Sequence, residues 1–264
     1  MGFFKAISKS ISRVGKTPGA YGTNINYVPI TAIDFDALHS FEIENGNYIE
    51  MGDIVEKKSQ ELAKVICRSD KNLQHLFSYI IREVLRNTPE HAETNEATIC
   101  GQYWSNGRAS IAIVDDGIGI KKSLEKNSVH KEYVQTDEDA LQVCVRPGIS
   151  QSFTPEKKNK DQDPWANSGF GLYMSSEICK KLNGDFWIIS GNKALKITRS
   201  GSTLYDTFFS GTAIGISFNV KNVEDSKKMI IDISKRGEFE AQGIRNAFQK
   251  ASTPSKSLLM NNRS

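Results

Sequence analysis

Three stretches decide the fold of this 264-residue chain: Glu83-Val-Leu-Arg-Asn87, Asp115-Asp-Gly-Ile-Gly119 and Asn167-Ser-Gly-Phe-Gly-Leu172. The first stretch places a carboxylate and a carboxamide one helical turn apart, on the same face. It ends a run, 73–85, in which apolar residues recur at spacings of three and four. The pair therefore predicts a helix with a polar end, suited to activating water beside a metal ion.

The second stretch follows a predicted hairpin. Strands at 97–104 and 109–115 flank Asn106-Gly107, and an Asn-Gly pair is the strongest short hairpin signal. Ile111-Ala-Ile-Val114 is apolar without alternation, which predicts a strand covered on both faces. Asp115 ends this strand, and the glycines after it let the backbone approach a flat ligand. A carboxylate there accepts the exocyclic amine of adenine but repels the carbonyl oxygen of guanine, so we expect ATP to be preferred over GTP.

The third stretch has two glycines directly before a helical pattern. Gly169 and Gly171 precede the apolar-periodic run from Leu172 to Leu182. Free backbone N–H groups and the positive end of a helix favour anions at such a point. The stretch therefore predicts where a polyphosphate binds.

Together these stretches resemble the motifs of the GHKL superfamily, named for gyrase, the heat-shock chaperone, histidine kinases and the mismatch-repair protein MutL. The resemblance covers residues 70–220 and includes a fourth element, Gly211-Thr212, before a late strand. It implies a stand-alone protein of the bacterial type with ATP and Mg²⁺ as cofactors. The implied fold class is α/β: a two-layer sandwich of the Bergerat type, a mixed sheet with helices on one face, plus an N-terminal helical extension.

The resemblance also implies a role for each motif residue. Glu83 is the implied catalytic residue, which orients or deprotonates the attacking group, and Asn87 is the implied Mg²⁺ ligand. Implied cofactor contacts are Asn87, His91, Asp115, Gly117, Gly119, Ser168, Gly169, Phe170, Gly171, Leu172 and Thr212. Two interpretations of His91 stay open, a phosphate contact and a solvated histidine near a helix end. Pro89 predicts that the helix kinks or ends close to Asn87.

We expect four regions along the chain. They are a basic amphipathic N-terminal extension (1–27), a helical layer packed on the ATP domain (28–69), the GHKL ATP-binding domain (70–220) and a basic C-terminal extension with a disordered end (221–264). Inside the domain, residues 120–168 are too long for an ordinary connection and too polar for core, which predicts a lid over the nucleotide. Thr136-x-x-Asp139 predicts a capped helix within it, and 154–164 is expected to be mobile.

Composition and charge exclude several classes of protein. The net charge is +3, but residues 1–16 and 221–264 each carry +4, which leaves −5 for the middle of the chain. Charge alone therefore gives no direct nucleic-acid signal. No apolar run approaches the ~20 residues that span a bilayer, and no signal peptide opens the chain. The four cysteines form no Cys-x-x-Cys pair. We expect a cytoplasmic protein with reduced cysteines and no transmembrane segment.

The N-terminal segment combines Phe3, Phe4, Ile7, Ile11 and Val14 with basic residues, an amphipathic helical pattern. Three interpretations compete: residues 3–14 lie on a membrane surface, pack on another subunit or partner protein, or cover their own domain. The sequence fails the myristoylation motif, because position 6 is alanine. We favour the protein contact, in a homodimer or with a partner protein.

Three functions fit the sequence. The first is a Mg-dependent ATP-binding protein with slow ATPase activity, whose ATP-driven lid closure switches oligomeric or partner interactions. The alternative is a protein kinase of the anti-sigma-factor type that phosphorylates a partner, and the third is a passive ATP sensor. Slow turnover is expected because the 44 residues after Val220 are too few for the second domain that supplies a catalytic lysine in gyrase and MutL. His39 lacks the acceptor motif of histidine autokinases and predicts a structural role.

Overall fold

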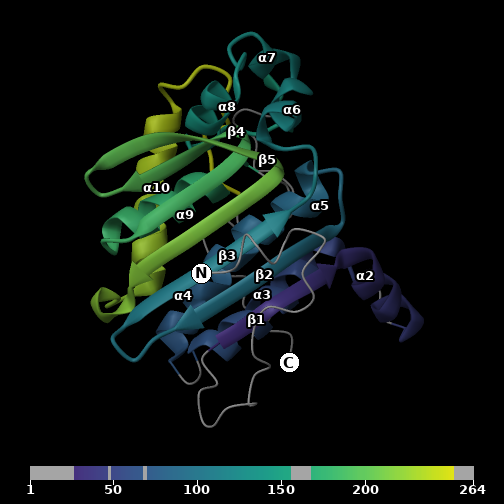
Figure 1. Ribbon diagram of the computed structural model, residues 1–264, viewed down its shortest axis with the longest axis vertical. Helices are drawn as coiled ribbons and strands as arrows, with labels where there is room; N and C mark the ends of the chain where they lie inside the picture. The colour runs from purple at the N-terminus through teal and green to yellow at the C-terminus, as the bar shows by residue number, and fades with distance from the viewer. Residues whose placement is uncertain (1–26, 47–48, 68–69, 156–167, 253–264) are drawn as a thin grey trace.

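The computed structural model describes residues 27–46, 49–67, 70–155 and 168–252 (Figure 1). Expectations for residues 1–26, for 253–264 and for most of 154–164 fall outside these ranges. The strands are β1 (Tyr27–Asp34), β2 (Glu96–Tyr103), β3 (Arg108–Asp115), β4 (Asp185–Thr198) and β5 (Gly201–Asn219). The helices are α2 (Phe35–Glu44), α3 (Met51–Cys67), α4 (Lys71–Leu85), α5 (Asn87–His91), α6 (Ile120–Glu125), α7 (Ser128–Lys131), α8 (Asp137–Cys144), α9 (Gly171–Lys181) and α10 (Ser226–Ala241).

The strands form one sheet in the order β1-β2-β3-β5-β4. The predicted two-layer α/β sandwich is confirmed, and so is the hairpin around Asn106-Gly107. The predicted late strand is present as part of β5, but β5 begins at Gly201, so Gly211-Thr212 lies inside the strand and does not open it. The expectation of a mixed sheet is wrong for the described residues, in which all four strand pairs are antiparallel. The hairpins β2–β3 and β4–β5 supply two of these pairs, and a short hairpin connection makes its two strands antiparallel.

The region 28–69 begins with a strand, which the prediction of a helical layer did not include. β1 pairs with β2 at the edge of the sheet, with an irregular register between Val28 and Thr31. Pro29 lies inside this irregularity. Proline has no N–H to donate and is tolerated at sheet edges and bulges, which is why the sequence concealed this strand. The helices α2 and α3 follow as expected, and His39 Nε2 lies 3.1 Å from the carbonyl oxygen of Ile49, a structural contact.

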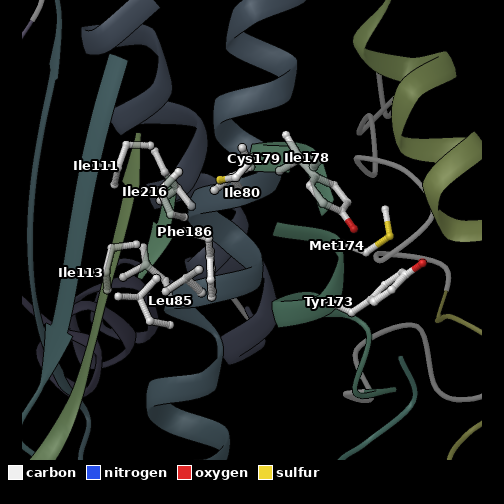
Figure 2. Close-up of a cluster of buried hydrophobic side chains, with 14 of the residues drawn as sticks. Ile80, Leu85, Ile111, Ile113, Tyr173, Met174, Ile178, Cys179, Phe186 and Ile216 are labelled. Atoms are coloured by element: carbon white, nitrogen blue, oxygen red, sulfur yellow. The ribbon is translucent and has the colours of Figure 1, made fainter. Parts of the chain in front are cut away.

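Helices α3, α4 and α9 cover one face of the sheet, and α10 packs on α4 and α9 (Figure 1). Figure 2 shows the core between the layers, where Ile111, Ile113 and Ile216 of the sheet lie near Ile80 and Leu85 of α4. These five side chains are at most 5% exposed. Each contributes on the order of 2 kcal/mol through the burial of its apolar surface.

Residues 120–155 form three helices that contribute to the core, so the expectation that this segment is too polar for core is wrong for its described part. Leu124, Val134, Leu141 and Phe153 are all buried. The predicted capped helix is confirmed as α8, which has a reciprocal capping box between Thr136 and Asp139. The partners of these apolar residues come from β4 and from the end of the described chain, which a local pattern does not reveal.

The C-terminal region is part of the domain up to Ser252, rather than an extension from it. α10 buries Met229, Ile230 and Ile233 against the other helices. Three cysteines are buried, Cys100 is half-buried, and all four are free, as expected. Among the described helices, none has the length and hydropathy that crossing a membrane requires.

Candidate functional site

A pocket lies where the end of β3 and the middle of β5 meet α5, α6 and the start of α9. Figure 1 shows α5, α6, α7 and α8 gathered at this end of the sheet. The apolar residues that line the pocket include Val84, Ile113, Ile120, Leu124, Ile149 and Ile214. Of the predicted site residues, the pocket brings together Asn87, His91, Asp115, Gly119, Gly169, Gly171, Leu172 and Thr212. The three motifs therefore meet in space, and a ligand there has both apolar and polar surfaces to contact.

Four predicted site residues do not line this pocket: Glu83, Gly117, Ser168 and Phe170. Gly117 packs behind it, because a Cβ on Gly117 would lie 2.2 Å from the carbonyl oxygen of Ala92. Phe170 is fully buried and packs edge-on against Tyr173. Ser168 is 1% exposed and its hydroxyl is bonded to Ser252. These three positions support the pocket without forming its surface.

Asp115 presents a fixed carboxylate to the pocket. Its Oδ1 accepts hydrogen bonds from the N–H groups of Gly117 (3.0 Å) and Thr212 (3.3 Å). Its Oδ2 makes no hydrogen bond with the part of the chain that the structure describes. Burial raises the pKa of Asp115 to about 6, although the two N–H groups favour the charged form. Asp115 is therefore an ionised acceptor at neutral pH, with one oxygen held by the backbone.

Adenosine binding should weaken as the pH falls through about 6, because protonation of Asp115 removes the charged acceptor. Affinity should drop roughly tenfold for each pH unit below this value. Adenosine is the probe because it carries no phosphate group that titrates in this range. Calorimetric titrations between pH 5 and pH 8 measure the effect, and a flat profile would contradict the assignment of Asp115.

His91 lies in the pocket wall with 19% of its side chain exposed, so the interpretation as a solvated histidine is wrong. Burial lowers its pKa to about 4, and the nearby positive charge of Arg86 acts in the same direction. The imidazole is therefore neutral at physiological pH. It can act as a polar neighbour of a ligand but brings no positive charge to phosphates.

The predicted helix break occurs next to Asn87. α4 ends at Leu85, and the five-residue α5 begins at Asn87 with Pro89 inside it. Asn87 lines the pocket while Glu83 stays in the buried part of α4. The described residues hold no cluster of three or more His, Cys, Asp or Glu side chains suited to a metal. Mg²⁺ bound to phosphates keeps several waters and needs only one or two protein oxygens, so a single amide oxygen fits that ion.

Glu83 belongs to a buried ionic cluster with Arg82 and Glu56. Its Oε1 accepts from Arg82 Nη2 at 2.7 Å, and Arg82 Nη1 donates to Glu56 Oε2 at 3.1 Å. Arg82 is 1% exposed; burial opposes its charge, but the two glutamates raise its pKa. Sequence reasoning missed Arg82 and Glu56. The only signal was a charged residue inside an otherwise apolar helical run.

Glu83 nevertheless adjoins the pocket through Gly171. A Cβ on Gly171 would lie 2.8 Å from Glu83 Oε2, so the second carboxylate oxygen lies directly behind the start of α9. α9 has no side-chain cap, and the first N–H groups of a helix have no partner within it. The residues that line the pocket include no lysine or arginine among those described. The helix end is therefore the main positive feature of this wall.

Ser190 is a further structural residue that the motifs did not indicate. Its hydroxyl donates to the carbonyl oxygen of Gly211 (2.8 Å) and accepts from the N–H of Ile120 (3.0 Å). It therefore joins the start of α6, after Gly119, to Gly211 inside β5. This one hydroxyl group thus contacts the chain after Asp115, at Ile120, and the neighbouring strand β5, at Gly211.

Residues 72–238 match the family model described as "Histidine kinase-, DNA gyrase B-, and HSP90-like ATPase". The matched range contains all the motifs that line the pocket. No curated protein and no solved structure matches the chain.

Proposed function

The chain belongs to the family of histidine kinase-, DNA gyrase B- and HSP90-like ATPases, and from this premise we propose that it binds Mg·ATP and hydrolyses it slowly in the cytoplasm. The observation that carries the proposal is Asp115, an ionised acceptor held at one oxygen by the N–H groups of Gly117 and Thr212. A fixed acceptor beside apolar walls suits the amine and flat face of adenine. The start of α9, which has no side-chain cap, suits the phosphates.

Each chemical task that the proposal requires has a candidate residue at or beside the pocket. Asn87 would hold Mg²⁺, which when bound supplies positive charge to the phosphates. Glu83, behind Gly171, would accept the proton of the attacking water. The buried ion pair with Arg82 holds the Glu83 carboxylate in place.

ATP should bind at least a hundredfold more tightly than GTP. Guanine places a carbonyl oxygen where adenine has its amine, so Asp115 would face a second acceptor across the pocket. An unpaired buried acceptor costs about 1–3 kcal/mol, and more when it is charged. Titration of the protein with each Mg·nucleotide measures the ratio. Equal affinities would count against the adenine assignment.

The reaction itself is tested with ATP labelled at the γ-phosphate. Hydrolysis releases labelled inorganic phosphate, whereas a protein kinase transfers the label to a protein. We expect free phosphate, at a rate that depends on Mg²⁺ and on Glu83. Label retained on this chain, or on a protein added as partner, would instead favour the kinase alternative.

We further propose that the nucleotide state alters how the chain contacts a second copy or a partner protein. The pocket is lined by α5, by α6 and by residues 149–151, so a bound nucleotide would contact segments that are far apart in the sequence. Light scattering with and without a non-hydrolysable Mg·ATP analogue tests this output for the homodimer.

A further inference from the structure

We infer that residues 244–252, here named the C-terminal strap, position residues 168–171, the glycine loop of the pocket. In this way the strap sets the affinity of the pocket for ATP. The inference rests on the proposed function. The strap lies beyond residues 72–238, the range that matches the family model. Its role therefore does not follow from the match to the family model.

One backbone relay connects the strap to two parts of the pocket wall. The N–H of Phe248 donates to the carbonyl oxygen of Gly148 (2.8 Å), and the N–H of Gly148 donates to the carbonyl oxygen of Gly169 (3.1 Å). Gly148 has φ +79°, and a Cβ there would lie 2.1 Å from the carbonyl oxygen of Phe248. Only glycine fits between the segments. Gly169 and Ile149, the residue after Gly148, both line the pocket.

A second attachment lies beside the first. The N–H of Ser252 donates to Ser168 Oγ at 2.9 Å, and the two hydroxyl oxygens are 3.3 Å apart. Ser168 directly precedes Gly169. Both serines are buried, with 1% and 4% exposed. The strap thus holds the glycine loop at consecutive residues, Ser168 and Gly169.

The strap is itself anchored in the core. Phe248 is 1% exposed and packs edge-on against Phe153, with ring centroids 5.2 Å apart. The N–H of Ala251 donates to Glu238 Oε1 (2.9 Å), at the end of α10. No residue of the strap lines the pocket. Its effect on a nucleotide is therefore positional, exerted through Gly148, Ser168 and Gly169.

This arrangement couples the position of the strap to nucleotide binding in the pocket. A seated strap and a bound polyphosphate both favour the same placement of Gly169. By linkage, displacing the strap weakens ATP binding, and ATP binding shifts the equilibrium of the strap toward its docked position by the same free energy. Any partner that draws the C-terminal segment away from Phe153 would release the nucleotide.

The test uses the full-length chain with Phe248→Ala and a matched control, Phe35→Ala. Both phenylalanines are at most 1% exposed, but Phe35 lies at the start of α2, in an element that contributes nothing to the pocket. The two changes should lower the thermal midpoint by similar amounts. Only Phe248→Ala should raise the Kd for Mg·ATP, by tenfold or more. Ser252→Ala, a milder change, should raise it about threefold. Equal effects of Phe248→Ala and Phe35→Ala would overturn the inference.

Hydrogen exchange of the wild-type chain gives an independent test, because it does not depend on whether a variant folds. A saturating Mg·ATP analogue should slow exchange of the Phe248 and Ser252 amides at least tenfold, while amides of α2 change little. Unchanged exchange at both strap amides would overturn the inference. If the wild-type chain shows no nucleotide binding at all, the proposed function fails first. Binding that is insensitive to the strap removes this inference alone.

Discussion

Replacing Asp115 with asparagine is expected to remove ATP binding and, at the same time, to make the protein more stable at neutral pH. Asparagine keeps an oxygen for the N–H groups of Gly117 and Thr212. Its other atom is an NH₂ group, which meets the amine of adenine donor to donor. The lost bond and the mismatch together should cost at least a hundredfold in affinity, on the order of 3 kcal/mol.

The gain in stability follows from the raised pKa of Asp115. Burial raises that pKa from 3.8 to about 6. The folded state therefore holds this proton more tightly than the unfolded state. The contribution of Asp115 to the free energy of unfolding falls as pH rises from 3.8 to about 6, by about 3 kcal/mol in total. Asp115→Asn should recover much of this free energy of unfolding at pH 7.5 and almost none of it at pH 4.

Urea unfolding at the two pH values measures the change, with Asp116→Asn as the matched control. Asp116 is the exposed neighbour and makes no contact with the pocket wall. The control should alter both ATP affinity and stability only slightly. If Asp115→Asn binds ATP with the wild-type Kd, Asp115 is not the residue that reads the base.

Replacing Glu83 with glutamine is expected to keep ATP affinity within about threefold but to lower hydrolysis at least a hundredfold, the usual contribution of a general base. Glutamine is chosen because its oxygen can still accept from Arg82. Glu83→Ala would leave Arg82 with one carboxylate partner fewer in a buried site and cost about 3–5 kcal/mol of stability. Loss of activity in Glu83→Ala could therefore come either from the missing general base or from unfolding of the protein.

Glu56→Gln is the control for this experiment. It removes the other carboxylate from Arg82 but lies on α3, away from the pocket. A similar loss of stability is expected from both glutamine variants, while hydrolysis should fall only in Glu83→Gln. Turnover that survives in Glu83→Gln, measured as phosphate release per protein, would show that another group activates the water.

The features predicted from sequence are those fixed by neighbours along the chain. The Asn106-Gly107 turn sets the β2–β3 register, and that register carries Asp115 to the end of a central strand. Pro89 correctly predicted the break beside Asn87. In each case the residues that determine the geometry lie within a few positions of the one they place.

The features that sequence reasoning missed depend on distant partners. β1 was obscured by Pro29, which a sheet edge tolerates and an interior strand does not. Phe153 belongs to the core because Phe248, far along the chain, packs against it. Glu83 was expected to act on the attacking group, and its ionic contacts with Arg82, which also binds Glu56, were not foreseen. Local sequence patterns do not indicate such contacts between distant residues.

A crystal structure of the chain with Mg²⁺ and a non-hydrolysable ATP analogue tests the central claim most directly. The account predicts the exocyclic amine of adenine within hydrogen-bonding distance, about 3 Å, of Asp115 Oδ2. It also predicts phosphates at the start of α9, beside Gly169 and Gly171, and the metal next to Asn87. A base bound away from Asp115, or phosphates away from the start of α9, would contradict it.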